Sequence, residues 1–423
     1  MATVTGGGTT TVLNVGSNDV NGAATALANS ISSKLAAGTL TVTANSLTAT
    51  GQNLFITSAP GTTTVDGPGV TANLINGGTG SVTVVGAGSA NQQVLGDNEN
   101  ITYFTAGGTG TVVLGDGNNL VGTPTAGGGA YNITTGAGND TVVAVTGNNT
   151  VSAGAGNNRI TTGLPGTSAN NLIFSSGNDT IAASGGSGID TVIAGNGSNA
   201  YITDGPRGLV YNGQGSNAAV TVIGGTGSET VYVGAGGGNV GGGAAGNNLL
   251  VGGAGSSNNT LFGGGNNDIL QAGATTGITT FVAAGGNETL SGAGSRGSNV
   301  FFTGPGNDVI GGANVTTPGG LAGGINDLVV IGNPTVGSIS GNSIIDTGVG
   351  RDLFSFTNRG AGTSTATVLI NNFRATDLIQ LSGFASQQAN ITTAASSAGT
   401  VVLSDGTKVT FGTAINLNSS NFS

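Results

Sequence analysis

The sequence contains no cysteine, histidine or tryptophan, and only 6% of its 423 residues are charged. Without cysteine the chain can form neither disulfides nor thiolate metal sites, and without histidine it has no imidazole for catalysis or for binding soft metals. Aromatic residues make up only 4%, which disfavours a thick core of large side chains. These absences leave open a hard cation held by oxygen ligands.

Basic residues are also scarce: 8 lysines and arginines stand against 18 acidic residues, for a net charge of -10. This balance argues against nucleic acid or an anionic membrane as a partner and favours cations. No apolar run approaches the roughly 18 to 20 residues of a membrane-spanning helix, so the chain is not expected to span a membrane. The first residues lack the features of a cleaved signal peptide, and we expect any export to be directed from elsewhere.

Glycine, by contrast, is abundant, with 85 residues. Disordered glycine-rich linkers contain few β-branched residues, whereas valine, isoleucine and threonine recur throughout these stretches. We therefore interpret the glycines as turns between short strands.

Three regions follow one another along the chain. Residues 17–37 predict one short helix, because polar residues 17–19 can cap it and apolar residues recur four apart until Gly38. Strands with period two follow, so residues 1–100 are expected to form an N-terminal cap and assembly region. Residues 101–345 form the glycine-rich repeat region, and residues 346–423 are expected to form a β-rich C-terminal cap.

The repeat consists of a glycine-rich turn, an Asn-Asp or Asn-Asn pair and a short apolar run, as in residues 136–142 and 304–310. The last acidic or amide position of successive turns recurs at steps of 19 or 20 residues. This series comprises Glu229, Asn248, Asp268, Glu288, Asp308, Asp327 and Asp346. A second series, Asn259 and Asn299, lies nine residues before Asp268 and Asp308. Each period therefore contains two turns.

A unit of about 20 residues with two short strands cannot bury its own apolar face, and stacking of successive units solves this problem. The sequence thus predicts an all-β protein, a β-solenoid with coils of about 20 residues.

The turns resemble the repeats-in-toxin (RTX) nonapeptide G-G-x-G-x-D-x-U-x, in which U is a large apolar residue. Residues 185–193 fit every fixed position, and residues 135–143 miss only the first glycine. The resemblance implies a parallel β-roll whose turns bind Ca²⁺ through the aspartate carboxylate and backbone carbonyls, completed by the turn of the neighbouring coil.

By the same resemblance, seven residues occupy the metal-liganding position: Asp140, Asp179, Asp190, Asp268, Asp308, Asp327 and Asp352. A longer carboxylate occupies it at Glu229 and Glu288, and an amide replaces it at Asn158, Asn199, Asn248, Asn259 and Asn299. The alternative is that most of these aspartates form turns and have solvated carboxylates, since Asp and Asn favour tight turns without metal.

The last region, with residues 348–356, 370–384 and 401–411, is similar to the C-terminal domain of proteins exported by type I secretion. The resemblance implies an uncleaved signal in the final residues and the type I secretion apparatus as a partner during export. An aromatic-rich cap without a role in export is the alternative.

No catalytic motif is present, because zinc-protease and serine-hydrolase signatures require histidine. We therefore expect no enzyme. The sequence favours a secreted, calcium-binding structural protein that self-assembles outside the cell, as a surface-layer or biofilm-matrix fibre subunit, with its contacts in residues 1–100 and cell-surface polysaccharide as a further candidate partner. The alternative is a monomeric RTX-type adhesin that binds a glycan, a surface or ice through one solenoid face.

Overall fold

The computed structural model describes most of the chain. The described residues are 1–6, 9–13, 15, 22–43, 53–57, 63–65, 70–75, 80–86, 91–105, 107–123, 128–183, 185–197, 200–311, 326–332, 340–346, 348–384 and 387–423. They fall into two compact units, Met1–Val210 (unit 1) and Tyr211–Ser423 (unit 2). Strand β20, Leu209–Asn212, spans the boundary between them.

Unit 1 is a parallel β-solenoid in which the chain alternates between two sheets. Sheet 1A contains β3 (Thr41–Thr43), β4 (Asn53–Thr57), β6 (Val70–Ile75), β8 (Gln92–Gly96), β10 (Gly108–Val113), β12 (Gly128–Thr134), β14 (Thr150–Ser152), β16 (Leu172–Ser175) and β18 (Asp190–Ala194). Sheet 1B contains β5 (Thr63–Val65), β7 (Val82–Val85), β9 (Ile101–Phe104), β11 (Leu120–Gly122), β13 (Thr141–Ala144), β15 (Arg159–Thr162), β17 (Thr180–Ala183) and β19 (Tyr201–Asp204).

The strands are short because each presents only one or two large apolar residues to the interior. In sheet 1B, Val121, Val142 and Ile160 lie in register on successive strands and are fully buried. Their neighbours on both sides point outward, since successive side chains of a strand alternate between its two faces. A narrow core of mainly β-branched side chains therefore runs between the two sheets, with Tyr103 and Tyr131 among its buried members.

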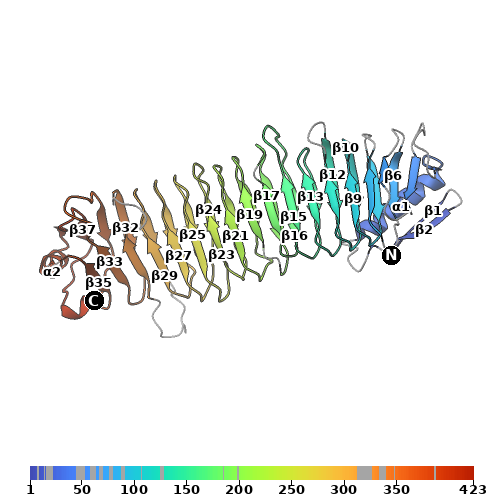
Figure 1. The fold of residues 1–423 in the computed structure, drawn as a ribbon. Coiled ribbons are helices and arrows are strands. Elements are labelled where there is room, and N and C mark those ends of the chain that lie inside the picture. Colours follow the sequence, from blue (N-terminus) through green and yellow to red (C-terminus); the bar gives the residue numbers. More distant parts are fainter. Residues whose placement is uncertain are drawn as a thin grey trace. The chain divides into compact units, whose positions relative to one another are not determined.

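The N-terminal end of unit 1 is covered by a helix and a hairpin (Figure 1). Helix α1 (Ala23–Ala36) buries Leu27, Ile31 and Leu35, and the antiparallel hairpin of β1 (Ala2–Gly6) and β2 (Thr9–Leu13) packs against it. Both belong to one apolar cluster with Leu74, Leu95 and other residues of sheet 1A. This part of sheet 1A is thus withdrawn from solvent.

Unit 2 repeats the same arrangement in its own two sheets. Sheet 2A contains β22 (Thr230–Tyr232), β24 (Leu249–Val251), β26 (Ile269–Gln271), β28 (Thr289–Ser291), β30 (Val309–Gly311), β32 (Asn342–Asp346), β34 (Thr367–Ile370) and β37 (Lys408–Phe411). Sheet 2B contains β21 (Val220–Ile223), β23 (Gly238–Gly241), β25 (Asn259–Phe262), β27 (Thr279–Val282), β29 (Asn299–Phe302), β31 (Leu328–Ile331), β33 (Leu353–Thr357) and β35 (Leu378–Ser382).

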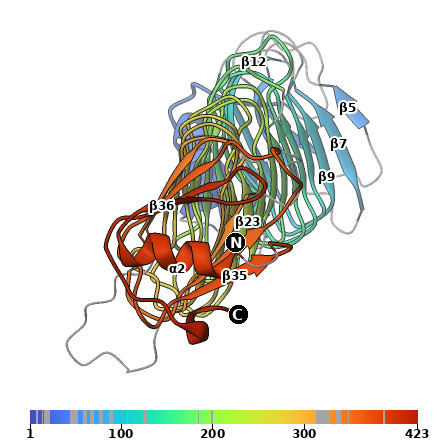
Figure 2. The same ribbon diagram turned by 90° about the vertical axis from the view of Figure 1, so that its left-hand side faces the viewer.

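The C-terminal end of unit 2 departs from the parallel pattern. Strand β36 (Thr400–Val402) pairs antiparallel with β37, and helix α2 (Gln388–Ser396) contacts both strands (Figure 2). The 3-10 helix η2 (Ser419–Asn421) contacts β35, and Phe422 forms a parallel bridge with Ile379. These elements cover strand edges that would otherwise be free to pair with another chain.

The predicted fold class is confirmed: the protein is a parallel β-solenoid with coils of about 20 residues and a short N-terminal helix. Helix α1 starts at Ala23, and the predicted capping residues 17–19 lie outside the described residues. Helix α2 was not predicted, because its Ala, Thr and Ser residues give only a weak apolar period.

Candidate metal-binding turns

The acidic and amide positions of the repeat form four columns, each beside the first strand residues of one sheet. Column 1A contains Asn149, Asn171 and Asp190, and column 1B contains Asn119, Asp140, Asn158 and Asp179. Column 2A contains Glu229, Asn248, Asp268, Glu288 and Asp308, and column 2B contains Asn259, Thr279, Asn299, Asp327, Asp352 and Asp377. All these side chains are buried. The carboxylates are therefore not solvated, contrary to the alternative interpretation of the sequence.

The single 20-residue series predicted from the sequence was wrong at its last two members. Asp327 lies in column 2B, because its backbone N–H donates to Asp352 of that column. Asp346 ends strand β32, in register with Gly311 and outside both columns. Strand β30 ends at Gly311 and β31 begins at Leu328, so the 19-residue step from Asp308 places the next acid beside β31, in the other column. Asn199 lies outside the described residues.

One hydrogen bond recurs along the columns. An Oδ1 atom accepts a proton from the backbone N–H of the column residue one coil earlier, as in Asn119 N to Asp140 Oδ1 (2.7 Å) and Asp140 N to Asn158 Oδ1 (2.9 Å). The same bond joins Glu229 to Asn248 and Asp327 to Asp352. Glycine allows the turns to stack this closely, since an added Cβ at Gly306 would lie 1.6 Å from the carbonyl oxygen of Gly286.

In Asn119 and Asn149 the remaining polar atom, Nδ2, points at the residue's own turn. Asn119 Nδ2 donates to the carbonyls of Gly115 (3.0 Å) and Gly117 (2.8 Å). Asn149 Nδ2 donates in the same way to the carbonyls of Thr146 and Gly147. An aspartate at the same position places a second oxygen there instead, and this oxygen requires a donor, a proton or a cation.

Several of the predicted liganding aspartates obtain a donor from the protein. Asp179 Oδ2 accepts from Ser175 Oγ (2.6 Å) and Asp190 Oδ2 from Thr162 Oγ1 (2.5 Å). Asp268 Oδ2 accepts from the backbone N–H of Gly264 (2.6 Å), and Asp352 Oδ2 accepts from Arg374 Nη2 (2.7 Å).

In column 2A, Asp308 Oδ2 accepts in the same way from the backbone N–H of Gly304 (2.9 Å), but Asp308 Oδ1 and both carboxylate oxygens of Glu288 lack such donors. Within the described part of the chain, three oxygen atoms of this pair have no hydrogen-bond partner: both carboxylate oxygens of Glu288 and Oδ1 of Asp308. Glu288 is 1% exposed and Asp308 is 0% exposed. Burial raises the pKa of Glu288 far above its usual range, and the neighbouring charges of Asp308 and Asp268 raise it further. Two ionised carboxylates in this position need a cation between them.

Asp140 is the intermediate case. Its Oδ2 has no hydrogen-bond partner in normal geometry. Burial raises the pKa of Asp140 to about 6, although hydrogen bonding by Thr135 and Asn119 lowers it. A cation or a proton would relieve this carboxylate as well.

No three acidic side chains converge on one point among the residues that the structure places. An ion at Glu288 and Asp308 would instead be held by two carboxylates from successive coils and by oxygen atoms of the stacked turns. Ca²⁺ accepts this donor set of carboxylates and backbone carbonyls in a flexible geometry. The residues present therefore fit the metal that the sequence predicted.

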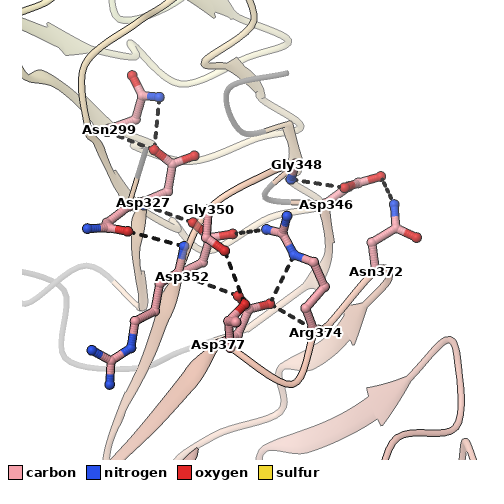
Figure 3. Close-up of polar contacts among 12 residues, drawn as sticks. Asn299, Asp327, Asp346, Gly348, Gly350, Asp352, Asn372, Arg374 and Asp377 are labelled. Carbon is pink, nitrogen blue, oxygen red and sulfur yellow. Dashed lines mark hydrogen bonds and ion pairs between the residues drawn. The ribbon is translucent and has the colours of Figure 1, made fainter. Parts of the chain in front are cut away.

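Column 2B ends in a cluster that the sequence interpretation missed (Figure 3). Arg374 forms an ion pair with Asp352 and lies 3.7 Å from Asp377, measured from Nε to Oδ2. The signal was present: the tripeptides starting at Asp327, Asp352 and Asp377 all read Asp-Leu followed by an apolar residue, at steps of 25 residues. A search for a 20-residue step does not find it.

Comparison with known proteins agrees with this geometry. The family described as RTX calcium-binding nonapeptide repeat (four copies) matches residues 134–164, 242–275 and 282–314. No curated protein and no solved structure matches the chain. The matched segments contain Asp140 in unit 1 and Asp268, Glu288 and Asp308 in unit 2.

The parallel coils and buried columns define the class of protein, a β-solenoid built from glycine-rich turns. The matched repeats specify it further: three segments of the chain are RTX nonapeptide repeats, which are calcium-binding motifs, and together with the parallel coils they support an RTX β-roll protein.

Proposed function

We propose that this protein is a secreted, calcium-binding structural protein that self-assembles outside the cell, as a subunit of a surface layer or of a biofilm-matrix fibre. RTX proteins are generally exported by type I secretion, which supports an extracellular location. The type I apparatus is the proposed partner during export, with its signal within residues 346–423. No helix in the described part of the chain is long and apolar enough to cross a membrane.

Calcium binding at Glu288 and Asp308 supports this location. Calcium is scarce in the cytosol and plentiful outside, so a chain whose buried acids need the metal gains stability when it emerges. The binding free energy then adds to the folding free energy.

The observation that carries self-assembly is an apolar row on the outer face of sheet 2B. Ile223 and Phe262 are 47% and 44% exposed, and Val282, Phe302 and Val330 continue the same outward row half-buried. None of the strands β21, β23, β25, β27, β29 and β31 contains a charged residue. Gly241 interrupts the row between Ile223 and Phe262, and exposed apolar surface of the kind on either side of it marks interaction sites.

A second copy of the chain suits this row because the row is uncharged and regularly spaced. A matching row on another copy can pack against it without leaving a charge buried. The sequence placed the assembly contact in residues 1–100, but α1 and the β1–β2 hairpin use their apolar residues to cover sheet 1A. We therefore propose the outer face of sheet 2B as the principal contact.

Negative-stain electron microscopy of the full chain, in millimolar calcium and after chelation, tests this proposal. We expect ordered sheets or filaments with calcium, and their loss in the variant Phe262→Glu, which places a charge on the row. The matched control Thr289→Glu adds the same charge at an exposed position of sheet 2A and should leave assembly intact. Monomers of wild-type protein in calcium would refute self-assembly, and assemblies unaffected by chelation would refute calcium as its switch.

The monomeric adhesin is the second candidate, and a groove in unit 1 favours it. A space of about 680 Å³ lies between α1 and the outer face of sheet 1A, lined by Leu27, Val113, Phe174 and Ile193 together with the polar side chain of Asn132. This volume lies within the range of small-ligand sites. A variant Phe174→Glu that abolishes binding to a surface or glycan, in a protein that remains monomeric, would favour this function.

A further inference from the structure

Asp352 and Asp377, in neighbouring coils of column 2B, form another pair of adjacent carboxylates in unit 2, and Asp327 lies one coil before Asp352. Both side chains are fully buried, and the backbone N–H of Asp352 donates to Asp377 Oδ1 (3.1 Å). Their position beside β33 and β35 corresponds to that of Glu288 and Asp308 beside β28 and β30. Two buried carboxylates one coil apart repel each other unless a cation lies near both.

The protein supplies that cation itself. Arg374 Nη2 lies 2.7 Å from Asp352 Oδ2, and its Nε lies 3.7 Å from Asp377 Oδ2. The backbone N–H of Arg374 also donates to Asp377 Oδ2 (2.8 Å), and the N–H of Asp377 donates back to the Arg374 carbonyl (3.0 Å). Figure 3 shows the guanidinium between the two carboxylates. The turn of residues 374–377 thus holds the backbone of Arg374 beside Asp377 of its own coil, while its guanidinium reaches Asp352 of the preceding coil.

A guanidinium is suited to this position because it stays charged at any physiological pH and donates in fixed directions. The Arg374 side chain is 31% exposed, so its charge keeps part of its hydration. It also occupies the second oxygen of Asp352, which a metal ion would have to use. Between Glu288 and Asp308 the sequence contains one basic residue, Arg296, which lies in the turn between β28 and β29.

We propose that Arg374 is a built-in substitute for calcium. It neutralises the Asp352–Asp377 pair, so the C-terminal end of unit 2 folds without metal and Asp352 is not a calcium ligand. The comparison with Glu288 and Asp308 rests on the proposed calcium binding, whereas the role of Arg374 does not. Within unit 2, the metal requirement is then confined to the repeats before the C-terminal cap.

Hydrogen exchange of the full chain, followed by mass spectrometry of peptides covering β33 and β35, tests this inference. Wild-type peptides should be equally protected in millimolar calcium and in chelator. In Arg374→Gln, protection in chelator should fall roughly ten- to hundred-fold, because one member of a buried ion pair is lost, and calcium should restore it.

The matched control is the double variant Arg374→Gln/Asp352→Asn. It removes one carboxylate together with the arginine and creates an Asn–Asp pair like Asn158–Asp179, in which Asn158 Nδ2 donates to Asp179 Oδ1 (2.9 Å). This variant should be protected with and without calcium. Its protection also shows that loss of the Arg374 side chain does not by itself unfold the cap.

Three results would overturn the inference: wild-type β33 and β35 losing protection in chelator, Arg374→Gln remaining protected there, or Arg374→Gln staying unprotected in calcium. Calorimetric titration of wild type and Glu288→Gln with calcium separates this outcome from the proposed function. If wild-type protein binds no calcium, the proposed site fails, but the chelator measurements still decide whether Arg374 neutralises the aspartate pair.

Discussion

Columns 1A and 2A use the same position of the coil in opposite ways. In column 1A, Asn171 precedes Asp190, and the amide Nδ2 donates to the carboxylate Oδ1 (2.8 Å). In column 2A, Glu288 precedes Asp308, and no amide separates the two acids. An asparagine amide donates a hydrogen bond to the acid of the next coil, as in Asn171, or to the carbonyls of its own turn, as in Asn149. The buried polar groups of such a column are then paired without metal. A second acid contributes only acceptors, and the pair depends on a cation.

The comparison shows that the nearest column neighbour of an aspartate matters more than the aspartate itself. Asp268 follows Asn248, whose Nδ2 donates to Asp268 Oδ1 (2.8 Å), whereas Asp308 follows Glu288, which has no side-chain amide, and Asp308 Oδ1 has no hydrogen-bond partner. The nonapeptide motif is equally good at both positions. We therefore expect dependence on calcium to be a property of pairs of coils.

The largest effect is expected from removal of the proposed metal site. Glu288→Gln should abolish the stabilisation of unit 2 by calcium, which is about 4 kcal/mol when calcium is 1,000-fold above the dissociation constant. In chelator the same variant should be more stable than wild type, because the like-charge contact with Asp308 is gone. Thermal unfolding with and without calcium measures both effects, with Asp346→Asn as the control that removes a carboxylate outside both columns. A calcium-induced shift as large in Glu288→Gln as in wild type would contradict the prediction.

A somewhat smaller effect is expected from breaking the amide ladder in unit 1. Asn149→Ala removes the acceptor of the Tyr131 N–H (3.0 Å) and the donor to the Thr146 and Gly147 carbonyls. Leaving these buried groups unpaired should cost roughly 3 kcal/mol. The loss should be equal in calcium and in chelator, as denaturant unfolding can show. A loss that calcium repairs would mean that this column also depends on metal.

The smallest effect concerns protons at Asp140. Because burial raises its pKa to about 6, the folded chain binds this proton more tightly than the unfolded chain does. The stability it contributes is fully present below the unfolded pKa of about 3.9 and is lost as pH rises through 6. In chelator, wild type should therefore lose on the order of 2 kcal/mol more than Asp140→Asn between pH 4 and pH 7.5. Parallel pH profiles of the two proteins would contradict this.

Much of the fold could be predicted from the sequence because it depends on local periodicity. The 20-residue step and the glycine-rich turns specify coils, and the alternating second series gives the two sheets. The candidate site could be predicted only in part, because the donors that satisfy Asp190 and Asp352 lie far along the chain. Thr162 is 28 residues from Asp190, and Arg374 is 22 residues from Asp352. Which residue reaches which acid depends on register, which the connecting segments shift.

The column bonds join each residue to its counterpart one coil away, whether 18 residues separate the two, as for Asp140 and Asn158, or 28, as for Asn299 and Asp327. Residues added between strands therefore leave these hydrogen bonds between coils unchanged. Within a unit, each coil contacts only its two neighbours, so its stability is the sum of local and nearest-neighbour contributions. Gene duplication can thus lengthen such a chain one coil at a time. We expect the residue at the column position, an amide or an acid, to set whether the new coil requires calcium.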